Sequence, residues 1–286
     1  MPIRTIMEIN NIYAMNANDY LIKFETEMRL INYCNRTIAN YISHTRIFLL
    51  HFDKDPHEIN EDEIKEYLKK SSSQAQLKQR IGSIKLFYEK VIHDPLKFKY
   101  IQYPRREQTL PDVLSQDEMR RLFAACSNLK HLTILQLFYS TGMRESEVIN
   151  LRVTDIDSNR MVIHIRQAKG KKDRLVPLSE RTLITLRQYY QSYKPKEYLF
   201  NGQFSLQYSA KSIQQFIHDY AAKAGITRRV YPHLIRHCFA THLYEGGADI
   251  NLIQALLGHK SVKTTMIYTH LSNRLISQVR TPDMVL

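Results

Sequence analysis

Cysteine is scarce in this sequence. Only three occur among 286 residues, at Cys34, Cys126 and Cys238, and no two of them form a C-x-x-C pair. An odd and widely spaced set of this kind is typical of reduced thiols in a cytosolic protein, where cysteine acts as a small core residue. We therefore expect no role for disulfides.

Long apolar runs are also missing. Nowhere do eighteen apolar residues follow one another, which excludes a membrane-spanning helix. The first residues, "MPIRTIMEINNIYAM", lack the apolar stretch of a secretory signal. The sequence shows no repeat and no low-complexity tract. These absences predict a soluble cytoplasmic protein with no membrane partner.

Basic residues, in contrast, are in clear excess. Lys and Arg number 41 against 28 acidic residues, a net charge of +13. Residues 1–110 hold 17 bases and 14 acids (+3), whereas residues 111–286 hold 24 bases and 14 acids (+10). This surplus favours a polyanionic partner and places it mainly with the second part of the chain.

The first part of the chain has the spacing of helices. Apolar residues recur every three or four positions in 18–33 and 35–52, and Asn60 is a plausible N-cap for a helix over 60–70. A fourth helix is expected over 73–92. We predict a small helical domain over residues 1–94.

A linker and a second domain follow. Residues 95–112 lie in a stretch that is rich in proline and charge and has no periodicity, so they are predicted to be an extended linker. Ser115 to Glu118 form a capping box that opens a helix. Residues 161–165 and 174–178 are β-rich runs around a polar turn, which indicates a hairpin, and 198–200 could add a strand. Residues 113–286 are therefore predicted to be mainly α with a small β-sheet, an α+β domain.

One short stretch of this domain gathers unusual chemistry. "YPHLIRHCFATHL", residues 231–243, places His233, Arg236, His237 and His242 on one expected helix. Three interpretations compete: a metal site, a solvated polar face, or a phosphate site. His233 and His237 share a helix face as zinc ligands would, but no glutamate follows the first histidine and no third ligand lies nearby. The sequence predicts no metal site.

Four further motifs favour the phosphate. Arg144 stands in "TGMRESE", Lys169 in "AKG", His259 in "LGH" and Tyr268 in "TTMIYTH". Together with His233 and Arg236 of "HLIR", and in this order, they resemble the tyrosine recombinases, the phage-integrase and Xer-like family. The resemblance spans residues 111–286, and the helical first part is similar to the family's core-binding domain.

The resemblance implies a site-specific recombinase that cleaves and rejoins DNA through a 3′-phosphotyrosine intermediate, without metal, ATP or any other cofactor. Two planar guanidiniums, Arg144 and Arg236, suit the non-bridging oxygens of a phosphodiester. Tyr268 is the implied nucleophile, and a phenol with a pKa near 10 needs help to react at neutral pH. The implied helpers are His233 for deprotonation, His259 for a hydrogen bond to the phosphate, and Lys169 as the acid for the leaving oxygen.

Other polar residues are expected to have supporting roles. Glu147 is expected to orient the active-site groups. His237 and His242 are expected to serve packing or helix hydrogen bonding. Lys171 and Lys172 are expected to contact the DNA backbone. In the first domain, a DNA face and a solvated helix surface explain the same residues equally well: Arg36, His44, Lys78, Arg80 and Lys85.

The expected partners are duplex DNA at specific recombination sites, a homotetramer on synapsed DNA, and possible accessory DNA-binding proteins, in the nucleoid. The tail from about residue 271 is apolar at helical spacing; it could fold back on its own domain, or dock on a neighbouring protomer as the resemblance implies. Two alternatives remain open: a type IB topoisomerase, and a binding-only regulator with an inactive site.

Overall fold

The computed structural model describes residues 3–52, 54–104, 112–168, 172–259 and 261–271. The chain divides into two compact units, Met1–Gln108 and Thr109–Leu286. Each unit has its own hydrophobic core. None of the helices within the described ranges is long and apolar enough to cross a membrane.

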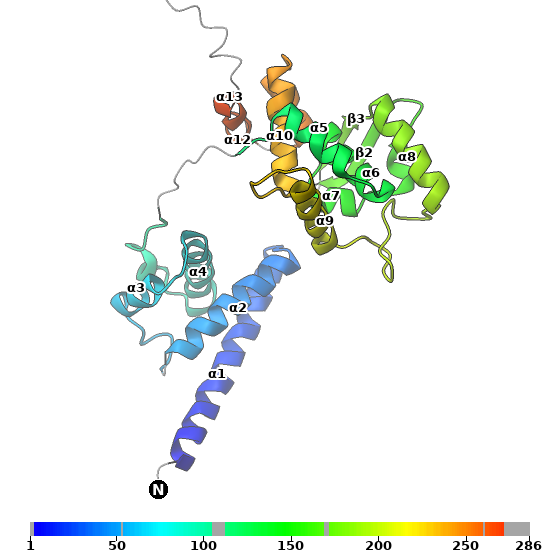
Figure 1. Ribbon diagram of the computed structural model, residues 1–286. Coiled ribbons are helices and arrows are strands. Elements are labelled where there is room, and N and C mark those ends of the chain that lie inside the picture. Colours follow the sequence, from blue (N-terminus) through cyan, green and yellow to red (C-terminus); the bar gives the residue numbers. More distant parts are fainter. Residues whose placement is uncertain (1–2, 53, 105–111, 169–171, 260, 272–286) are drawn as a thin grey trace, which may run out of the picture. The chain divides into compact units, whose positions relative to one another are not determined.

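The first unit is helical (Figure 1). Its elements are α1 (Ile3–Leu30), α2 (Asn35–His51), α3 (Glu61–Lys69), α4 (Gln74–Phe87), the π-helix η1 (Tyr88–Ile92) and the 3₁₀ helix η2 (Pro95–Phe98). The predicted N-cap at Asn60 is confirmed, because its side chain accepts a hydrogen bond from the Glu63 amide and Glu63 returns one. Helix α1 begins well before the expected residue 18, since neither proline nor glycine interrupts residues 3–30.

The core of the first unit continues beyond the predicted domain of 1–94. Phe24, Phe48 and Phe87 form its aromatic centre. Phe98 and Ile101 belong to the same core and are almost fully buried. Residues 95–101 are therefore packed against the helices instead of forming the start of an extended linker. Residues 105–111 lie outside the described part of the chain.

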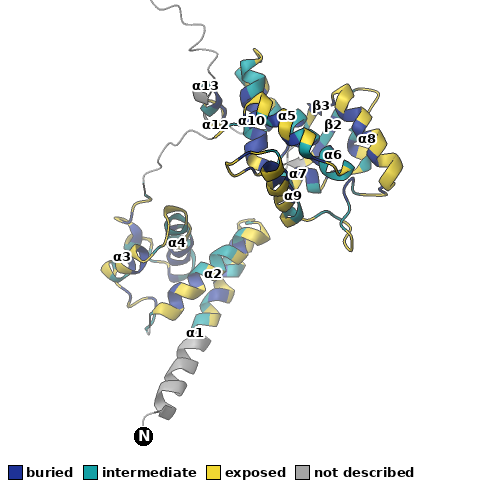
Figure 2. Cartoon of the chain, in the orientation of Figure 1, coloured by how far each residue is buried: buried dark blue, intermediate teal, exposed yellow. Residues whose placement is uncertain are grey.

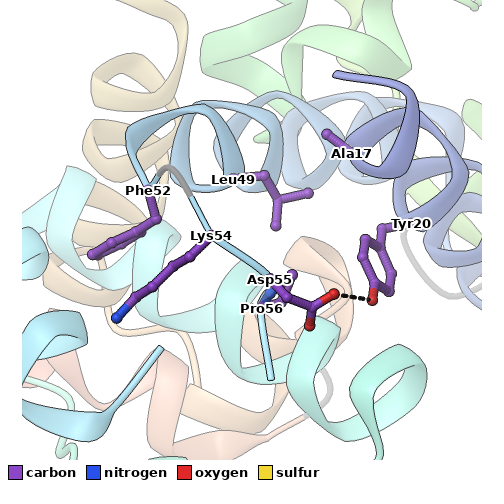
Figure 3. Close-up of a pocket in the computed structure, with 7 residues that line it drawn as sticks. All are labelled: Ala17, Tyr20, Leu49, Phe52, Lys54, Asp55 and Pro56. Carbon is purple, nitrogen blue, oxygen red and sulfur yellow. Dashed lines mark hydrogen bonds between the residues drawn. The ribbon is translucent and has the colours of Figure 1, made fainter. Parts of the chain in front are cut away.

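A small pocket in this unit lies between α1, the end of α2 and the loop that follows (Figure 3). The hydroxyl of Tyr20 donates a hydrogen bond to Oδ2 of Asp55 at 3.1 Å across it. Burial and the charge of Asp55 raise the pKa of Tyr20, so the phenol keeps the proton that it donates. The contact ties Asp55 to α1, a structural role.

The second unit is mainly α-helical with one small sheet, as the sequence predicts. Its elements are α5 (Gln116–Ala125), α6 (Leu129–Thr141), α7 (Glu145–Ile149), the 3₁₀ helix η3 (Val153–Asp155), β1 (Ile156–Asp157), β2 (Val162–Ala168), β3 (Lys172–Pro177), α8 (Glu180–Tyr193), α9 (Ala210–Lys223), α10 (Pro232–Glu245), α11 (Ile250–Leu257), α12 (Val262–Thr265) and α13 (Ile267–Leu271).

The three strands form an antiparallel sheet in the order β1-β2-β3. The predicted hairpin is confirmed, with Ile163 opposite Val176 and Ile165 opposite Arg174. The strand expected at 198–200 does not form: Tyr198 makes only an isolated bridge with Arg152. The predicted capping box of Ser115 and Glu118 opens α5.

Helix α10 is the centre of the second unit. It packs against α6, α9, α11 and α13, and its residues from Leu234 to Ala240 are largely buried (Figure 2). Gly142, which ends α6 with φ of 63°, allows a close approach, because a Cβ there would lie 2.4 Å from Cδ1 of Phe239. This approach brings the start of α7 to the side of α10.

Candidate active site

Arg236 lies in the middle of α10 and is the most deeply buried charge of the site. Its side chain is 1% exposed. Nη1 donates to the carbonyl oxygen of Gly142 at 2.6 Å, and Nη2 donates to that of Leu257 at 2.7 Å. Burial, followed by the charge of Arg144, lowers the pKa of Arg236 to about 10, which leaves it protonated at neutral pH. Two carbonyls at helix C-termini thus hold one guanidinium plane.

Arg144 directly precedes α7, and both its backbone and its side chain are hydrogen-bonded to Glu147. Its backbone N–H donates to Oε2 of Glu147 and its Nη1 donates to Oε1, each at 2.8 Å. Nη2 lies 3.3 Å from the carbonyl oxygen of Gly258. The Arg144 side chain remains 22% exposed, more than the 9% of Arg174.

Glu147 ties this arginine to a second one. Arg174 of β3 donates from Nη1 to Oε1 at 2.9 Å and from Nη2 to Oε2 at 2.7 Å, while its Nε donates to the Leu256 carbonyl at 2.7 Å. Burial would raise the pKa of Glu147, but the hydrogen bonds and charges of Arg174 and Arg144 outweigh it and keep the pKa below its usual value. The ionised carboxylate therefore joins β3, α7 and the end of α11.

Tyr268 lies on α13 and is 1% exposed. Its hydroxyl oxygen lies 3.0 Å from Nδ1 of His237. It shares a small apolar cluster with Phe239, Ile253 and Leu257. Burial raises the pKa of Tyr268 to about 12, although the charges of Arg236 and Arg144 act in the opposite direction.

The imidazoles of His237 and His259 lie beside this phenol, and that of His233 lies beside His237. The rings of His233 and His237 meet edge to face with centroids 4.5 Å apart. The ring of His259 lies nearly parallel to that of Tyr268, with centroids 6.4 Å apart, and its Nδ1 is 2.9 Å from Oγ1 of Thr265. Desolvation, and after it the charges of Arg236 and Arg144, lowers the pKa of His233. Desolvation lowers the pKa values of His237 and His259 to about 4, with His233 the next cause for His237 and Arg236 the next for His259. All three are neutral at pH 7.

The structure therefore brings together five of the six residues predicted to be catalytic, namely Arg144, His233, Arg236, His259 and Tyr268. Glu147 lies beside them. Lys169 and Lys171 fall outside the described residues, as does the side chain of Lys172 at the start of β3. His242, also on α10, pairs its Nδ1 with the Tyr139 hydroxyl at 2.9 Å.

Two residues of the site were not assigned to it from the sequence. His237 was expected to serve packing or helix hydrogen bonding, yet it is the imidazole that reaches the Tyr268 hydroxyl. Arg174 was not singled out at all. A signal for it existed, because Arg174 alternates with Val176 and Leu178, which are both buried, and a charge on a buried strand face needs a partner.

The candidate DNA contacts of the first unit lie on α2 and α4, which pack together. Arg36 is exposed, and His44 pairs with Gln79 at 3.1 Å. Lys78 and Lys85 are half-buried. Arg80 instead packs over the ring of Tyr67, 5.0 Å from its centroid, and donates to Ser71, which favours a structural role.

No group of three or more His, Cys, Asp or Glu residues in the described part of the chain could hold a metal ion. His233 and His237 contact each other edge to face, and the Nδ1 atoms of His237 and His259 are each engaged with a hydroxyl group. The cluster is thus organised around a phenol and two guanidiniums.

Comparison with known proteins covers most of the chain. The model of the phage integrase family matches residues 112–274, and that of the phage integrase N-terminal SAM-like domain matches residues 21–98. A tyrosine recombinase of Pseudothermotoga lettingae is 32% identical over 89% of this chain and 92% of its own length. The crystal structure of XerA recombinase has 32% sequence identity and a TM-score of 0.56, with 93% of this chain and 100% of that chain covered.

The fold is also shared with a more distant recombinase. The structure of XerH site-specific recombinase bound to its palindromic difH substrate has a TM-score of 0.70 and 23% identity, with 84% of this chain and 78% of that chain covered. The two family models follow one another along the chain in the order of the two compact units. The chain belongs to the phage integrase family of tyrosine recombinases, enzymes that cleave and rejoin DNA at specific sites through a phosphotyrosine and without metal or ATP.

Proposed function

We propose that Arg144, His233, Arg236, His259 and Tyr268 form a single centre for phosphodiester transfer. The scissile phosphate binds between the two guanidiniums, which neutralise its non-bridging oxygens as charge grows on them. Glu147 orients Arg144 for this task through its hydrogen bonds to that arginine, and Arg174 holds Glu147 in place.

The observation that carries the proposal is the state of Arg236. Nε has no hydrogen-bond partner in the described part of the chain, although the side chain is buried and both Nη atoms are engaged. Leaving a buried donor unpaired costs about 1–3 kcal/mol. Such a cost is tolerated where a ligand completes the site, and a phosphate oxygen is the acceptor that suits a guanidinium edge.

The reaction then needs no external energy source. The Tyr268 oxygen attacks the phosphorus, the bond to the 5′ oxygen breaks, and the energy of the broken ester is kept in a 3′-phosphotyrosine. The departing 5′ oxygen takes a proton, for which Lys169 is our candidate donor. The 5′-hydroxyl of the partner strand reverses these steps and joins the exchanged strands.

The first unit supplies the second part of the DNA-binding surface in this proposal, with Arg36, His44, Lys78 and Lys85 facing the backbone and Lys171 and Lys172 contacting it from the hairpin. The palindromic difH substrate bound by XerH supports DNA as the substrate. Binding should weaken steeply with salt, by a log–log slope of about 0.9 for each phosphate neutralised. We place the protein in the cytoplasm, associated with the nucleoid.

We further propose a homotetramer on two synapsed sites, with the tail after Leu271 docking on the neighbouring protomer and accessory DNA-binding proteins assisting. A head-to-tail contact of this kind closes into a ring. Truncation after Ser272 should leave a folded protein that binds DNA and no longer forms the tetramer. Tetramers of normal yield from the truncated chain would contradict the assembly.

The test is to trap covalent complexes. Fragments of the genomic DNA that flanks the coding sequence are incubated with the protein, and adducts that survive denaturation are sequenced to find the cleaved phosphate. The wild-type chain should form adducts at one sequence, and Tyr268→Phe should bind the same DNA without forming any.

Two controls separate this function from its rivals. Arg236→Ala and Arg144→Ala should reduce adduct formation far more than affinity, because both act where charge develops. Relaxation of a supercoiled plasmid that lacks the selected sequence would favour a type IB topoisomerase. Binding without adducts in the wild-type chain would favour a regulator with an inactive site.

A further inference from the structure

The strongest contact that the proposed function leaves unused is the one between His237 and Tyr268. The resemblance assigns the activation of the phenol to His233, three residues before Arg236. In the structure, the hydroxyl oxygen of Tyr268 is paired with His237 Nδ1 at 3.0 Å, and His233 contacts His237. The direct partner of the reacting oxygen is therefore the second histidine of the helix.

The geometry of α10 explains the difference. His233 and His237 are four residues apart and lie on one face of the helix, one turn from each other. His233, the nearer to the helix start, is exposed, whereas His237 is half-buried. The ring centroids of His237 and Tyr268 are 5.6 Å apart, so the two side chains meet at their polar edges.

We propose that His237 is the proton acceptor for Tyr268, and that His233 acts through His237. This proposal rests on the proposed function of Tyr268 as the nucleophile. In the tautomer with its proton on Nε2, the lone pair of Nδ1 faces the hydroxyl group. As the Tyr268 oxygen forms its bond to phosphorus and the 5′ oxygen leaves, the phenolic proton passes to Nδ1.

The proton balance closes over the whole recombination cycle. When a 5′-hydroxyl later attacks the phosphotyrosine, the bond between phosphorus and the Tyr268 oxygen breaks and the leaving phenolate takes the proton back from Nδ1. No proton source beyond the site is needed for Tyr268. The low pKa of His237 leaves the ring neutral, with its Nδ1 lone pair available, before the phosphate binds.

The charged and titratable groups around His237 all bear on this step. They are His233 and Arg236 on α10 itself, Tyr268 on α13 and His259 after α11. On the α6 side, Tyr139 pairs with His242. Arg236 stabilises the ionised phenol and opposes a persistent imidazolium. The negative charge of the bound phosphodiester offsets the two guanidiniums and favours the proton on Nδ1 while the phosphotyrosine exists.

The chain offers a matched control on the same helix. His242 pairs its Nδ1 with the hydroxyl of Tyr139 at 2.9 Å, with ring centroids 5.8 Å apart, nearly the geometry of the His237 pair. Both histidines are half-buried, and both contribute a hydrogen bond and packing. A loss of stability alone should therefore affect His237→Asn and His242→Asn alike.

The experiment measures single-turnover adduct formation on a nicked duplex of the sequence found by trapping. We expect His237→Ala and His237→Asn to slow it by about 10²–10⁴-fold, the range of general-base catalysis, while His242→Asn stays near the wild-type rate. Asparagine can bond the Tyr268 hydroxyl but cannot take its proton, so restoration of the rate by His237→Asn would overturn the proposal in favour of positioning alone.

Two further measurements locate the defect. A duplex with sulfur in place of the 5′ bridging oxygen has a leaving group that needs no acid; it should rescue Lys169→Ala and leave His237→Asn slow. In His237→Asn the rate should rise with pH from about 7 to 9, because the phenol must ionise before it attacks, whereas the wild-type rate should not. Rescue of His237→Asn by the sulfur duplex, or equal pH profiles, would overturn the proposal.

Tyr268→Phe in the same assay separates the two claims. Adducts formed by Tyr268→Phe would refute the nucleophile and with it the role of His237. Loss of adducts in Tyr268→Phe, together with a normal rate in His237→Asn, would refute the proton acceptor alone. Thermal unfolding and DNA binding of each variant show that it is folded.

Discussion

Replacing Glu147 by glutamine tests the ionic framework of the site. The substitution keeps the shape of the side chain and removes its charge. Glu147 is 8% exposed and accepts four hydrogen bonds, two from Arg144 and two from Arg174. A carboxamide offers one acceptor oxygen, and its NH₂ group would face a guanidinium.

The expected cost follows from these contacts. Removing one partner of a buried ion pair costs about 3–5 kcal/mol, because the other charge stays buried without compensation. The Arg174 side chain is 9% exposed and cannot reach water easily, whereas that of Arg144 is 22% exposed and can turn outward. We therefore expect the free energy of unfolding to fall by about 3 kcal/mol, the lower end of that range.

The assay is thermal unfolding of the full chain, followed in the transition of the second unit. At roughly 2–4 °C for each kcal/mol in a domain of this size, Tm should fall by about 6–12 °C. The matched control is Glu145→Gln, two residues earlier on α7, whose carboxylate contacts only Gln214 among the hydrogen bonds of the described residues. It should change the free energy of unfolding by less than about 0.5 kcal/mol. Equal Tm values for the two variants would refute the reasoning.

Two further predictions concern the same unit. Gly142→Ala combines a left-handed φ with a Cβ 2.4 Å from Phe239, so it should lower the free energy of unfolding by about 2–4 kcal/mol in chemical denaturation. Gly225→Ala is the control: its nearest atom is 3.6 Å away, so it should cost only about 1 kcal/mol for the left-handed backbone. Equal losses in the two variants would contradict the close packing at Gly142. Acidification from pH 7 to 5 should lower the free energy of unfolding by about 1–2 kcal/mol for each of His237 and His259, because a folded pKa of about 4 lies below the ordinary value of 6.5 and the unfolded chain takes up protons first. Denaturant titrations over that range measure the effect: the contribution of the two histidines to the free energy of unfolding should be fully present above about pH 6.5 and decline toward pH 4. In the double variant His237→Gln, His259→Gln the dependence of the free energy of unfolding on pH should be weaker. An unchanged pH dependence in that variant would contradict the prediction.

The sequence predicted the helices, the hairpin and the gathering of the motif residues well, because each depends on local patterns. Apolar spacing is a property of one segment, and so are the capping boxes at Asn60 and Ser115. The motif order brought Arg144, Arg236 and Tyr268 to one site through the resemblance, although no local rule says that they meet.

What could not be predicted depends on which side chain faces which neighbour across the fold. Whether His233 or His237 reaches Tyr268 is decided by the position of α13 against α10, which one helix does not reveal. Arg174 joins β3 to α7 and α11, a meeting of three elements far apart in the sequence. Residues 198–200 had the composition of a strand but found only one backbone bridge at Arg152.

Because Tyr268 is buried, higher thermal stability and faster DNA cleavage make opposite demands on the packing around it. The ring belongs to an apolar cluster with Phe239, Ile253 and Leu257, and a phosphate in duplex DNA can reach its oxygen only if this cluster loosens. Substitutions that pack the cluster more tightly should therefore yield a protein that survives heat better and cuts DNA more slowly. Selection for higher thermal stability at these positions would lower the rate of DNA cleavage. Relatives adapted to high and to low temperature should therefore differ at the residues of this cluster more often than at Arg144 and Arg236.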